Sequence, residues 1–331
     1  MPEHATTAAA RNTPRTPASR GFVISAPRSG STWLMRSLSA HPQVHATEHR
    51  LFGPYHDEVH DAGSDRPRLR ITLDRFADAH ARHLNLTGTG LDVAGARERV
   101  LRALAEGLFA LDHELTGKPT VVDKITPNPG TADTVVARVR ELFAGAPLVA
   151  LVRDGRDMVT SVVHHWLTKR ALGVHDPAHA DERRRLVAGG RVGELGRFFD
   201  DDEIGVWASL WRECVRATRN ADAEVRFEAM VRDQRAVLRM LLTSLGIDAT
   251  ERDLDVCIAG GRFEAASGGR PRGQLDPTAD ARAGVVGDWQ RVFTRRDGEA
   301  FDTIAGDELV ELGYAEPGWW RELPQDLSRC A

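Results

Sequence analysis

The segment that most constrains this chain joins a short apolar run to an amphipathic stretch through a turn of small and basic residues. The apolar run is Phe22–Ile24, the turn is Ala26–Thr32, and a helix is expected to begin near Trp33. The first backbone N–H groups of a helix lack intrahelical partners and lie at the positive end of its dipole, so an anion is the expected ligand. Gly30 permits close approach of the backbone, and Arg28 adds a fixed positive charge. The segment therefore predicts a strand, an anion-binding turn and a helix.

Hydroxyl groups complete this turn, but its sequence departs from the Walker pattern of kinases. Ser31 and Thr32 follow directly after Gly30 and can donate hydrogen bonds to an anion. The Walker pattern requires glycine at position 25 and lysine at position 31, where this chain has serine. This difference argues against a magnesium-dependent P-loop kinase. A serine- and glycine-rich connection that merely caps a helix is the alternative, so a functional prediction needs a second anion site.

The rest of the chain alternates short apolar runs with helical patterns. Further β-type runs lie at 120–122, 148–152 and 225–227, and apolar faces of helical spacing precede the last two. Such alternation predicts an α/β fold, with a single parallel sheet flanked by helices on both faces. Ligands of such sheets bind beyond the carboxyl ends of the strands, where the Arg28 turn is expected.

Length and composition predict one large domain with insertions. The chain has 331 residues, of which 41% are hydrophobic and 28% charged, as in ordinary globular proteins. Residues 1–19 are rich in Ala, Thr, Pro and Arg and are expected to form a disordered tail before a domain at 20–331. The stretches at about 49–119 and 166–206 interrupt the alternation and are expected to shape an acceptor pocket or lid. Within the second, the basic run 183–185 and the acidic run 200–203 are expected to be solvated.

The net charge and the cysteine content limit which binding partners and which cellular location we expect. A formal net charge of −4 gives no overall attraction to nucleic acid or to an anionic membrane, and neither is expected as a partner. No apolar run approaches the roughly 18 residues of a membrane helix, and the tail lacks the apolar core of a signal peptide. The three cysteines are scattered, which favours a reducing, cytoplasmic location. The oligomeric state stays open, with a homodimer as one alternative.

Two further segments carry the features of anion sites. Arg153 follows the run 148–152 directly, and Ser161 lies two helical turns later, so a guanidinium fork and a hydroxyl can hold a phosphate. Between them, Arg156 and Asp157 are expected to lie in a surface turn with Arg–Asp pairs. The second segment is the basic, glycine-rich stretch 268–289, which includes Arg282 and Gly284 and is expected to close over a ligand.

Taken in order, these segments resemble the sulfotransferases that use 3′-phosphoadenosine 5′-phosphosulfate (PAPS), from about Gly21 to Leu312. The resemblance implies the P-loop NTPase-like sulfotransferase fold and the product 3′,5′-bisphosphoadenosine (PAP). It implies that 27–33 holds the 5′-phosphosulfate, that 153–161 holds the 3′-phosphate, and that 282–289 is a late nucleotide-binding loop. Trp33 would lie against the adenine, with Phe263 as a candidate for its other face. The nucleotide-binding residues implied are Arg28, Ser29, Gly30, Ser31, Thr32, Trp33, Arg153, Ser161, Phe227, Phe263, Arg282 and Gly284.

The chain departs from this family pattern in two places. The late loop usually carries Arg-Lys-Gly, and here Ala283 replaces the lysine, so that contact is lost or is supplied by Arg270 or Arg272. Cytosolic small-molecule members place a catalytic histidine two residues after a lysine. Here Lys124 keeps the lysine, but Thr126 takes the histidine position. The base must therefore come from elsewhere.

Glu48 and His49 are the two candidates for the base. Tyrosine-sulfating and some bacterial members carry a catalytic glutamate shortly after the first helix. A carboxylate can act as base if burial raises its pKa, and a histidine titrates near neutral pH. Residue type favours Glu48, whereas counting from the motif puts His49 at the family position. Arg28 and Lys124 are predicted to stabilise negative charge on the leaving phosphate, with no metal required.

The predicted activity is transfer of a sulfuryl group from PAPS to an alcohol or phenol of a small molecule. The two insertions carry little net basic character, which favours a small hydroxylated metabolite over a highly anionic glycan. Sulfation of a glycan or a tyrosyl peptide is the alternative. A P-loop kinase and a non-catalytic nucleotide-binding module are two further, less favoured alternatives.

Overall fold

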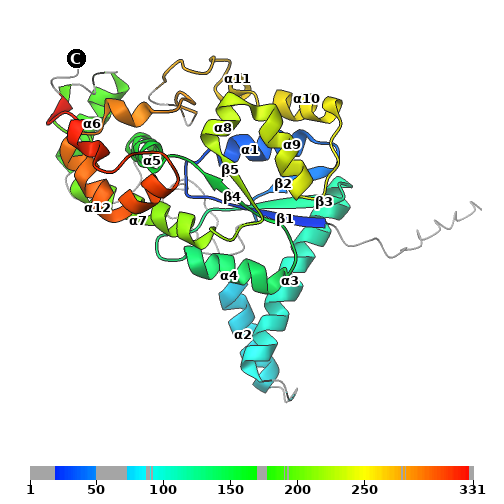
Figure 1. Cartoon of the computed structure of the whole chain (residues 1–331). Coiled ribbons are helices and arrows are strands. Elements are labelled where there is room, and N and C mark those ends of the chain that lie inside the picture. Colours follow the sequence, from blue (N-terminus) through cyan, green and yellow to red (C-terminus); the bar gives the residue numbers. More distant parts are fainter. Residues whose placement is uncertain are drawn as a thin grey trace, which may run out of the picture.

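A parallel sheet of five strands in the order β2-β3-β1-β4-β5 forms the centre of the computed structural model (Figure 1). The structure describes residues 19–49, 73–86, 90, 92–169, 177–189, 191, 194–276, 279 and 281–327. The strands are β1 (Ser19–Ile24), β2 (Val44–Thr47), β3 (Thr120–Ile125), β4 (Leu148–Val152) and β5 (Ala223–Arg226). Because β1 lies between β3 and β4, the chain leaves it towards one edge of the sheet and later returns to the other. Such a reversal of strand order creates a crevice at the carboxyl ends.

Helices cover both faces of the sheet. The α-helices are α1 (Ser31–Ala40), α2 (Leu73–Leu86), α3 (Val93–Thr116), α4 (Ala132–Leu142), α5 (Gly155–Lys169), α6 (Pro177–Ala188), α7 (Asp201–Ala217), α8 (Phe227–Arg232), α9 (Gln234–Ser244), α10 (Glu251–Gly260), α11 (Phe263–Ala266) and α12 (Arg295–Glu311). Two 3-10 helices, η3 (Asp288–Arg291) and η4 (Trp319–Glu322), follow in the last third of the chain. The predicted α/β fold with a helix-flanked parallel sheet is confirmed.

Alternation along β1 distributes its side chains between two cores. Phe22 and Ile24 pack with residues of α3 and α4, whereas Val23 packs on the opposite face with residues of α1 and α9. All five residues of β4 are buried, as expected for a strand covered on both faces. A third core joins α5, α7 and α12 beside β4. The central strands are thereby fixed, and the loops at their carboxyl ends start from rigid positions.

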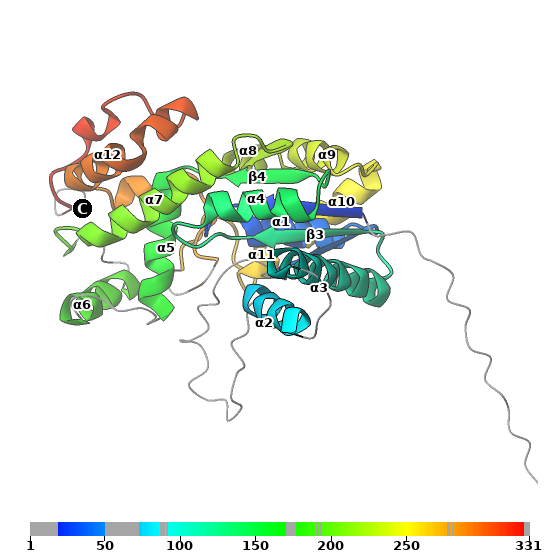
Figure 2. The same ribbon diagram turned by 90° about the horizontal axis from the view of Figure 1, so that it is seen from below.

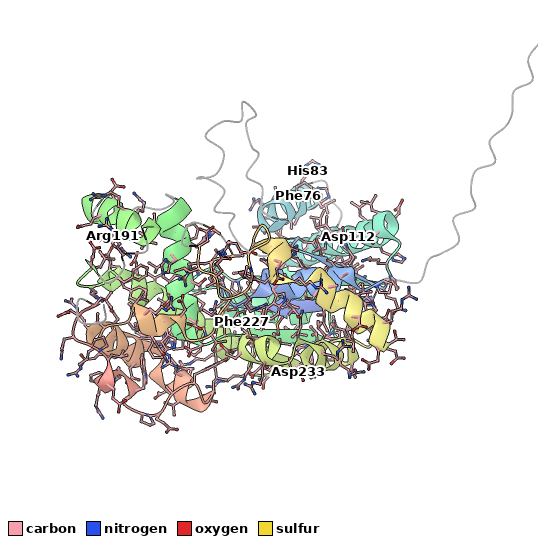
Figure 3. The ribbon with its side chains drawn as sticks, turned by 90° about the horizontal axis from the view of Figure 1, so that it is seen from above. Phe76, His83, Asp112, Arg191, Phe227 and Asp233 are labelled. Carbon is pink, nitrogen blue, oxygen red and sulfur yellow. The ribbon has the colours of Figure 1, made fainter. Side chains whose placement is uncertain are left out.

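Helices α2 and α3 form a pair beneath the sheet (Figure 2). The buried Ala77 and Ala81 of α2 let the two helices pack closely, while Phe76 is 43% exposed. Figure 3 shows Phe76 and His83 at the outer edge of the molecule and Phe227 near its middle. Among the described residues, no helix has the length and apolar character needed to cross a membrane.

The structure adds one strand and shifts another. Strand β2 was not predicted, because it has four residues and two of them, His45 and Thr47, are polar. The strand predicted at 225–227 corresponds to β5, which begins earlier, at Ala223, and ends at Arg226. Phe227 begins α8. Ser19, expected in the tail, is the first residue of β1. The remainder of the predicted tail, residues 1–18, lies outside the described residues.

The two charge runs of the second insertion are not simply solvated, which corrects the expectation from sequence. The side chain of Arg183 is fully buried, and its guanidinium lies 3.0 Å from the Asp200 carboxylate and 2.8 Å from that of Glu203. Burial of a guanidinium is tolerated when carboxylates pair with it and accept its hydrogen bonds. The basic run and the acidic run therefore meet and join α6 to the start of α7.

The start of α5 yields a stability prediction. A Cβ atom at Gly155 would lie 2.6 Å from Trp211 Cδ2 and 2.7 Å from Phe301 Cζ, closer than packed atoms allow. We expect Gly155→Ala to lower the free energy of unfolding by about 1–3 kcal/mol, the usual cost of overpacking a core. Urea unfolding measures this change. The control is Gly205→Ala in α7, where a Cβ would meet nothing within 4 Å, and which we expect to be neutral or stabilising. Equal effects of the two substitutions would contradict the packing argument.

Candidate functional site

The turn after β1 has the backbone of an anion-binding loop. Arg28 has a φ of 60°, the sole positive value at a non-glycine residue in the described chain, and Gly30 has a φ of 91°. Strained backbone of this kind is often found at ligand sites. A Cβ atom at Gly30 would lie 2.6 Å from Phe227 Cδ2, so glycine is needed for contact as well as for conformation. Helix α1 begins directly afterwards at Ser31, which directs its first N–H groups towards the crevice.

A cavity of about 670 Å³ lies at the carboxyl ends of the strands, within the size range of cofactor and substrate sites. It brings together residues from the turn after β1, from α5, from α8, and from the late loop 281–288. Six cationic side chains among the described residues line it, against two carboxylates. The cations are Arg28, Arg36, Lys124, Arg153, Arg272 and Arg282, and the acids are Glu48 and Asp288. The cavity is suited to a ligand with several negative charges.

Arg153 connects the walls of this cavity. Its Nη1 donates to the Arg28 carbonyl at 3.1 Å, and its Nη2 donates to the Val285 carbonyl at 3.1 Å. The guanidinium lies 4.3 Å from the centroid of the Phe227 ring, a cation–π distance. Its buried Nε has no hydrogen-bond partner among the described residues. An unused donor in a cationic cavity fits an anionic ligand, because buried polar groups are normally hydrogen-bonded.

The late loop is held to α5 by Asp157. Its carboxylate is fully buried and accepts the backbone N–H groups of Gly287 at 2.8 Å and Trp289 at 3.0 Å. Burial raises the pKa of Asp157 above its usual value, against the opposing effect of the Arg153 charge. Arg282 forms an ion pair with Asp288 at the base of the loop. The loop is therefore attached to the helix that carries Ser161.

Arg156 and Asp157 do form Arg–Asp pairs, with Asp154 and Arg153, but they are buried and not in a surface turn. Arg156 is buried, is paired with Asp154 at 2.7 Å, and lies 3.9 Å from the Trp289 ring centroid and 4.6 Å from that of Trp319. The expected surface position was wrong because the two aromatic rings and the Tyr314 carbonyl that contact Arg156 come from about 130 to 160 residues further along the chain. Short-range spacing carries no information about them.

Trp33 and Phe263, the two aromatic side chains predicted to contact the adenine ring, both lie close to the guanidinium of Arg272 in this structure. Arg272 lies 4.2 Å from the Trp33 ring centroid and 5.5 Å from that of Phe263, and its Nη1 donates to the Gly284 carbonyl at 3.0 Å. Burial lowers the pKa of Arg272. Arg270 instead donates to the backbone carbonyls of Gln274, Ala281 and Arg282 within the loop. Of these two arginines, Arg272 lines the cavity and Arg270 braces the loop.

Glu48 and Lys124 form an ion pair at the edge of the cavity. Lys124 Nζ lies 2.8 Å from Glu48 Oε2, with 13% of the lysine side chain and 37% of the glutamate side chain exposed. Both residues follow or end neighbouring parallel strands, β2 and β3, whose register brings Thr47 opposite Asp123. Lys124 thus pairs with Glu48, the residue that directly follows the adjacent strand β2, and not with its sequence neighbour Asp123.

His49 lies on the other side of the same strand ends, packed against Phe109. Its Nε2 is 2.7 Å from Asp112 Oδ2, its Nδ1 is 3.7 Å from Asp123 Oδ2, and its backbone N–H donates to Asp123 Oδ1 at 2.9 Å. Its side chain is 8% exposed and does not line the cavity as described. Burial acts to lower the pKa of His49, but the hydrogen bonds and charges of Asp123 and Asp112 outweigh it, and the net shift is upward.

Most of the predicted site residues line the cavity. Ser29 is an exception, because its side chain is buried beneath the turn. His165 of α5 lines the cavity, while burial and the charges of Arg282 and Arg183 lower the pKa of His164. Arg36 also lines the cavity and was not predicted from sequence, although its position one turn after Thr32 on α1 would have indicated it. Within the described parts of the chain, no residue of the two predicted insertions lines the cavity, and no group of three or more His, Cys, Asp or Glu could hold a metal ion.

Comparison with known proteins bears on the identity of this site. A family model described as "Sulfotransferase family" matches residues 22–251. The nodulation protein NoeE of Sinorhizobium fredii is 24% identical over 308 residues, which cover 89% of this chain and 66% of that protein. Similar solved structures include a mouse sulfotransferase complexed with PAP, at 16% identity, 88% and 84% coverage and a TM-score of 0.45. Another is the sulfotransferase domain from the curacin biosynthetic pathway, at 17% identity, 92% and 100% coverage and a TM-score of 0.45.

The environment of His49 predicts a pH-dependent stability. Because its folded-state pKa is raised, protonated His49 stabilises the fold fully below the ordinary value of 6.5, and this contribution is lost as the pH rises through the raised value. We expect His49→Gln to lower the free energy of unfolding by about 1–3 kcal/mol at pH 6, since the buried Asp123 and the partly exposed Asp112 lose a charged partner. The difference from the wild-type protein should shrink towards pH 9.

Denaturant titrations at several pH values measure this effect. His45→Gln is the matched control, because His45 Nε2 lies 3.4 Å from the same Asp112 carboxylate but its side chain is 28% exposed. We expect a smaller and flatter change for this variant. A His49→Gln effect that does not vary with pH would contradict the charged pairing.

Proposed function

This chain belongs to the sulfotransferase family, and we propose that it transfers a sulfuryl group from PAPS to a hydroxyl of a small molecule, with PAP as the second product. The observation that carries the proposal is the convergence of three cationic segments on one cavity of about 670 Å³. Turn 27–33, residues Arg153 and Ser161, and loop 281–288 each contribute donors to its wall. A nucleotide with phosphate groups at both ends of its ribose requires such separated donors.

The donor is proposed to lie with its adenine between Trp33 and Phe263. Its 5′ end would meet the N–H groups at the start of α1 and the side chain of Arg28, which already donates through Nε to Ser161 Oγ at 3.4 Å. The unused Nε of Arg153 would serve the 3′-phosphate. Arg272, which now lies between the two rings, would move to that phosphate and replace the lysine that is absent at Ala283.

Glu48 is proposed as the general base and Lys124 as the cation at the reacting end. Glu48 would accept the proton of the acceptor hydroxyl while the acceptor oxygen bonds to sulfur and the bond from sulfur to the bridging phosphate oxygen breaks. Lys124 and Arg28 would donate hydrogen bonds to that leaving oxygen, where negative charge develops. The ion pair between Glu48 and Lys124 places both groups at one edge of the cavity before any ligand binds.

The acceptor is proposed to be a phenol or an alcohol of modest size. Sulfation of a glycan or a tyrosyl peptide is the rival within the same chemistry. A magnesium-dependent kinase would need the Walker lysine, and Ser31 stands at that position. A binding module without turnover would bind PAP and release no sulfated product.

Incubation with radiolabelled PAPS and a panel of acceptors tests the proposal. The panel contains phenols, alcohols, tyrosyl peptides and glycans, and calorimetry measures the affinity for PAP in parallel. Labelled small-molecule products without added metal would support the proposal. Label on glycans alone would overturn the acceptor class, and transfer from ATP with magnesium would overturn the donor.

The paired residues at the cavity edge give a catalytic prediction. We expect Glu48→Gln and Lys124→Met each to lower kcat by about 100-fold or more, the usual range for a lost base or a lost donor to developing charge. The affinity for PAP should change by less than about threefold in Glu48→Gln, because a base touches the acceptor. Steady-state kinetics and calorimetry measure these changes.

Two further variants serve as comparisons for this prediction. Glu114→Gln on the exposed face of α3 makes the same charge change outside the cavity and should leave kcat unaltered. His49→Gln should retain most of the activity at temperatures where it is folded. If His49→Gln loses activity while Glu48→Gln keeps it, the assignment of the base is wrong.

The position of Arg272 gives a prediction about donor binding. We expect Arg272→Ala to weaken PAP binding about 10- to 100-fold, as expected for loss of a hydrogen bond to a charged group. Binding of adenosine 5′-phosphosulfate, which lacks the 3′-phosphate, should change little. Adding Ala283→Lys to this variant should restore much of the PAP affinity, as calorimetry can measure. Tighter PAP binding by Arg272→Ala would instead mean that the guanidinium merely blocks the space between the two rings.

A further inference from the structure

A second, smaller cavity adjoins the proposed donor site. It has a volume of about 470 Å³, and the described residues that line it come from α1, from the end of β2, from β3 and from the end of α10. Four residues line both cavities, namely Thr32, Arg36, Glu48 and Lys124. In Figure 1 these elements lie together on the side of the sheet away from α12. The proposed base and its lysine partner therefore stand at the border between the two spaces.

The walls of this acceptor groove, as we call the smaller cavity, are uncharged apart from the shared border. The described residues that line it alone are Met35, Ser39, Ala40, Ala46, Thr47 and Gly260. Gly260 allows α10 to approach α1 closely, because a Cβ atom there would lie 2.5 Å from the Ala40 Cβ. The groove is mostly apolar and edged by the hydroxyl groups of Ser39 and Thr47, which suits a small organic molecule.

Arg36 is the cation that this border leaves available. Glu48 and Lys124 are paired at 2.8 Å and offset each other's charge. The guanidinium of Arg36 makes no hydrogen bond or ion pair with any residue that the structure describes, and its side chain is half-buried. It lies one helical turn after Thr32, so it faces both cavities from α1. A guanidinium fork of this kind matches a carboxylate or another oxyanion.

We propose that this groove binds the acceptor and that Arg36 selects acceptors carrying an anionic group, such as hydroxy acids with an apolar body. The acceptor hydroxyl would lie at Glu48, its apolar part against Met35 and Ala46, and its carboxylate at Arg36. This inference rests on the proposed function and names the acceptor class of that site. Arg36 acts as a specificity-determining residue and takes no part in proton transfer.

Matched pairs of acceptors test the inference. 4-Hydroxyphenylacetate and 10-hydroxydecanoate are each compared with their amides, which keep the shape and remove the charge. Calorimetry measures binding to the full-length protein with and without PAP, and kcat/KM is measured with PAPS. We expect the wild-type protein to prefer an acid over its amide by about 10-fold or more, the effect of a charge-assisted hydrogen bond.

Three variants identify the residue and the groove. Arg36→Gln should lower affinity and kcat/KM for the acid about 10- to 100-fold, with changes below about threefold for the amide and for PAP. Ala46→Leu should fill the groove and weaken acid and amide equally, without altering PAP binding. Arg252→Gln, an equal charge change on the exposed side of α10, should alter none of these values.

Each result decides the inference separately from the proposed function. Equal binding of acid and amide by the wild-type protein, or failure of both acids to bind, overturns it even if PAP binds and other acceptors are sulfated. Weaker PAP binding by Arg36→Gln also overturns it, since Arg36 would then serve the donor. If PAP fails to bind the wild-type protein, the proposed function is wrong, and acid binding measured without PAP still tests the groove.

Discussion

The side chain of Arg153 connects the three segments on which the cavity depends. It leaves the carboxyl end of β4, binds the carbonyl of Arg28 in the first turn and that of Val285 in the late loop, and packs on Phe227 at the start of α8. A guanidinium can do this because its donors are rigid and directed to several sides at once. Without this cation, the strained turn at Arg28 and the glycine-rich loop would lose their common attachment.

The same arrangement places positive charge at the carboxyl ends of the strands. Carboxylates behind the cavity wall, such as Asp157 and Asp154, accept backbone or guanidinium donors, and they hold the loops in place. Lys124 and Arg282 pair with lining carboxylates and Arg153 pairs with Asp157, yet the six lining cations outnumber the two lining carboxylates, Glu48 and Asp288, among the described residues. An anion entering the cavity therefore meets an excess of cationic donors, and one of them, Arg153, is already held in position by the carbonyls of Arg28 and Val285.

The local sequence predicted those structural features that depend on residues a few positions apart. The Arg28 turn, the start of α1 and the helices α4 and α7 follow from spacing and composition, because turn geometry and helical periodicity involve residues a few positions apart. The short strand β2 was missed, since pairing with β3 and not its own composition makes it a strand. The burial of Arg156 and of Arg183 was missed as well, because the aromatic ring of Trp319 over Arg156 and the Glu203 carboxylate that pairs with Arg183 belong to other elements of the chain.

The sequence by itself determined the α/β class, the anion-binding turn and the set of residues from which a site could be built. It left Glu48 and His49 both as candidates for the base, with residue type favouring Glu48, and it left open whether the lysine contact at Ala283 is lost or is supplied by Arg270 or Arg272. Only the tertiary structure decided that Glu48 reaches the cavity edge beside Lys124 while His49 is held by Asp112 and Asp123. It likewise placed Arg272 between Trp33 and Phe263. The physical reason is that adjacent residues at a strand end point to opposite sides, and which side faces the ligand depends on the helices packed there.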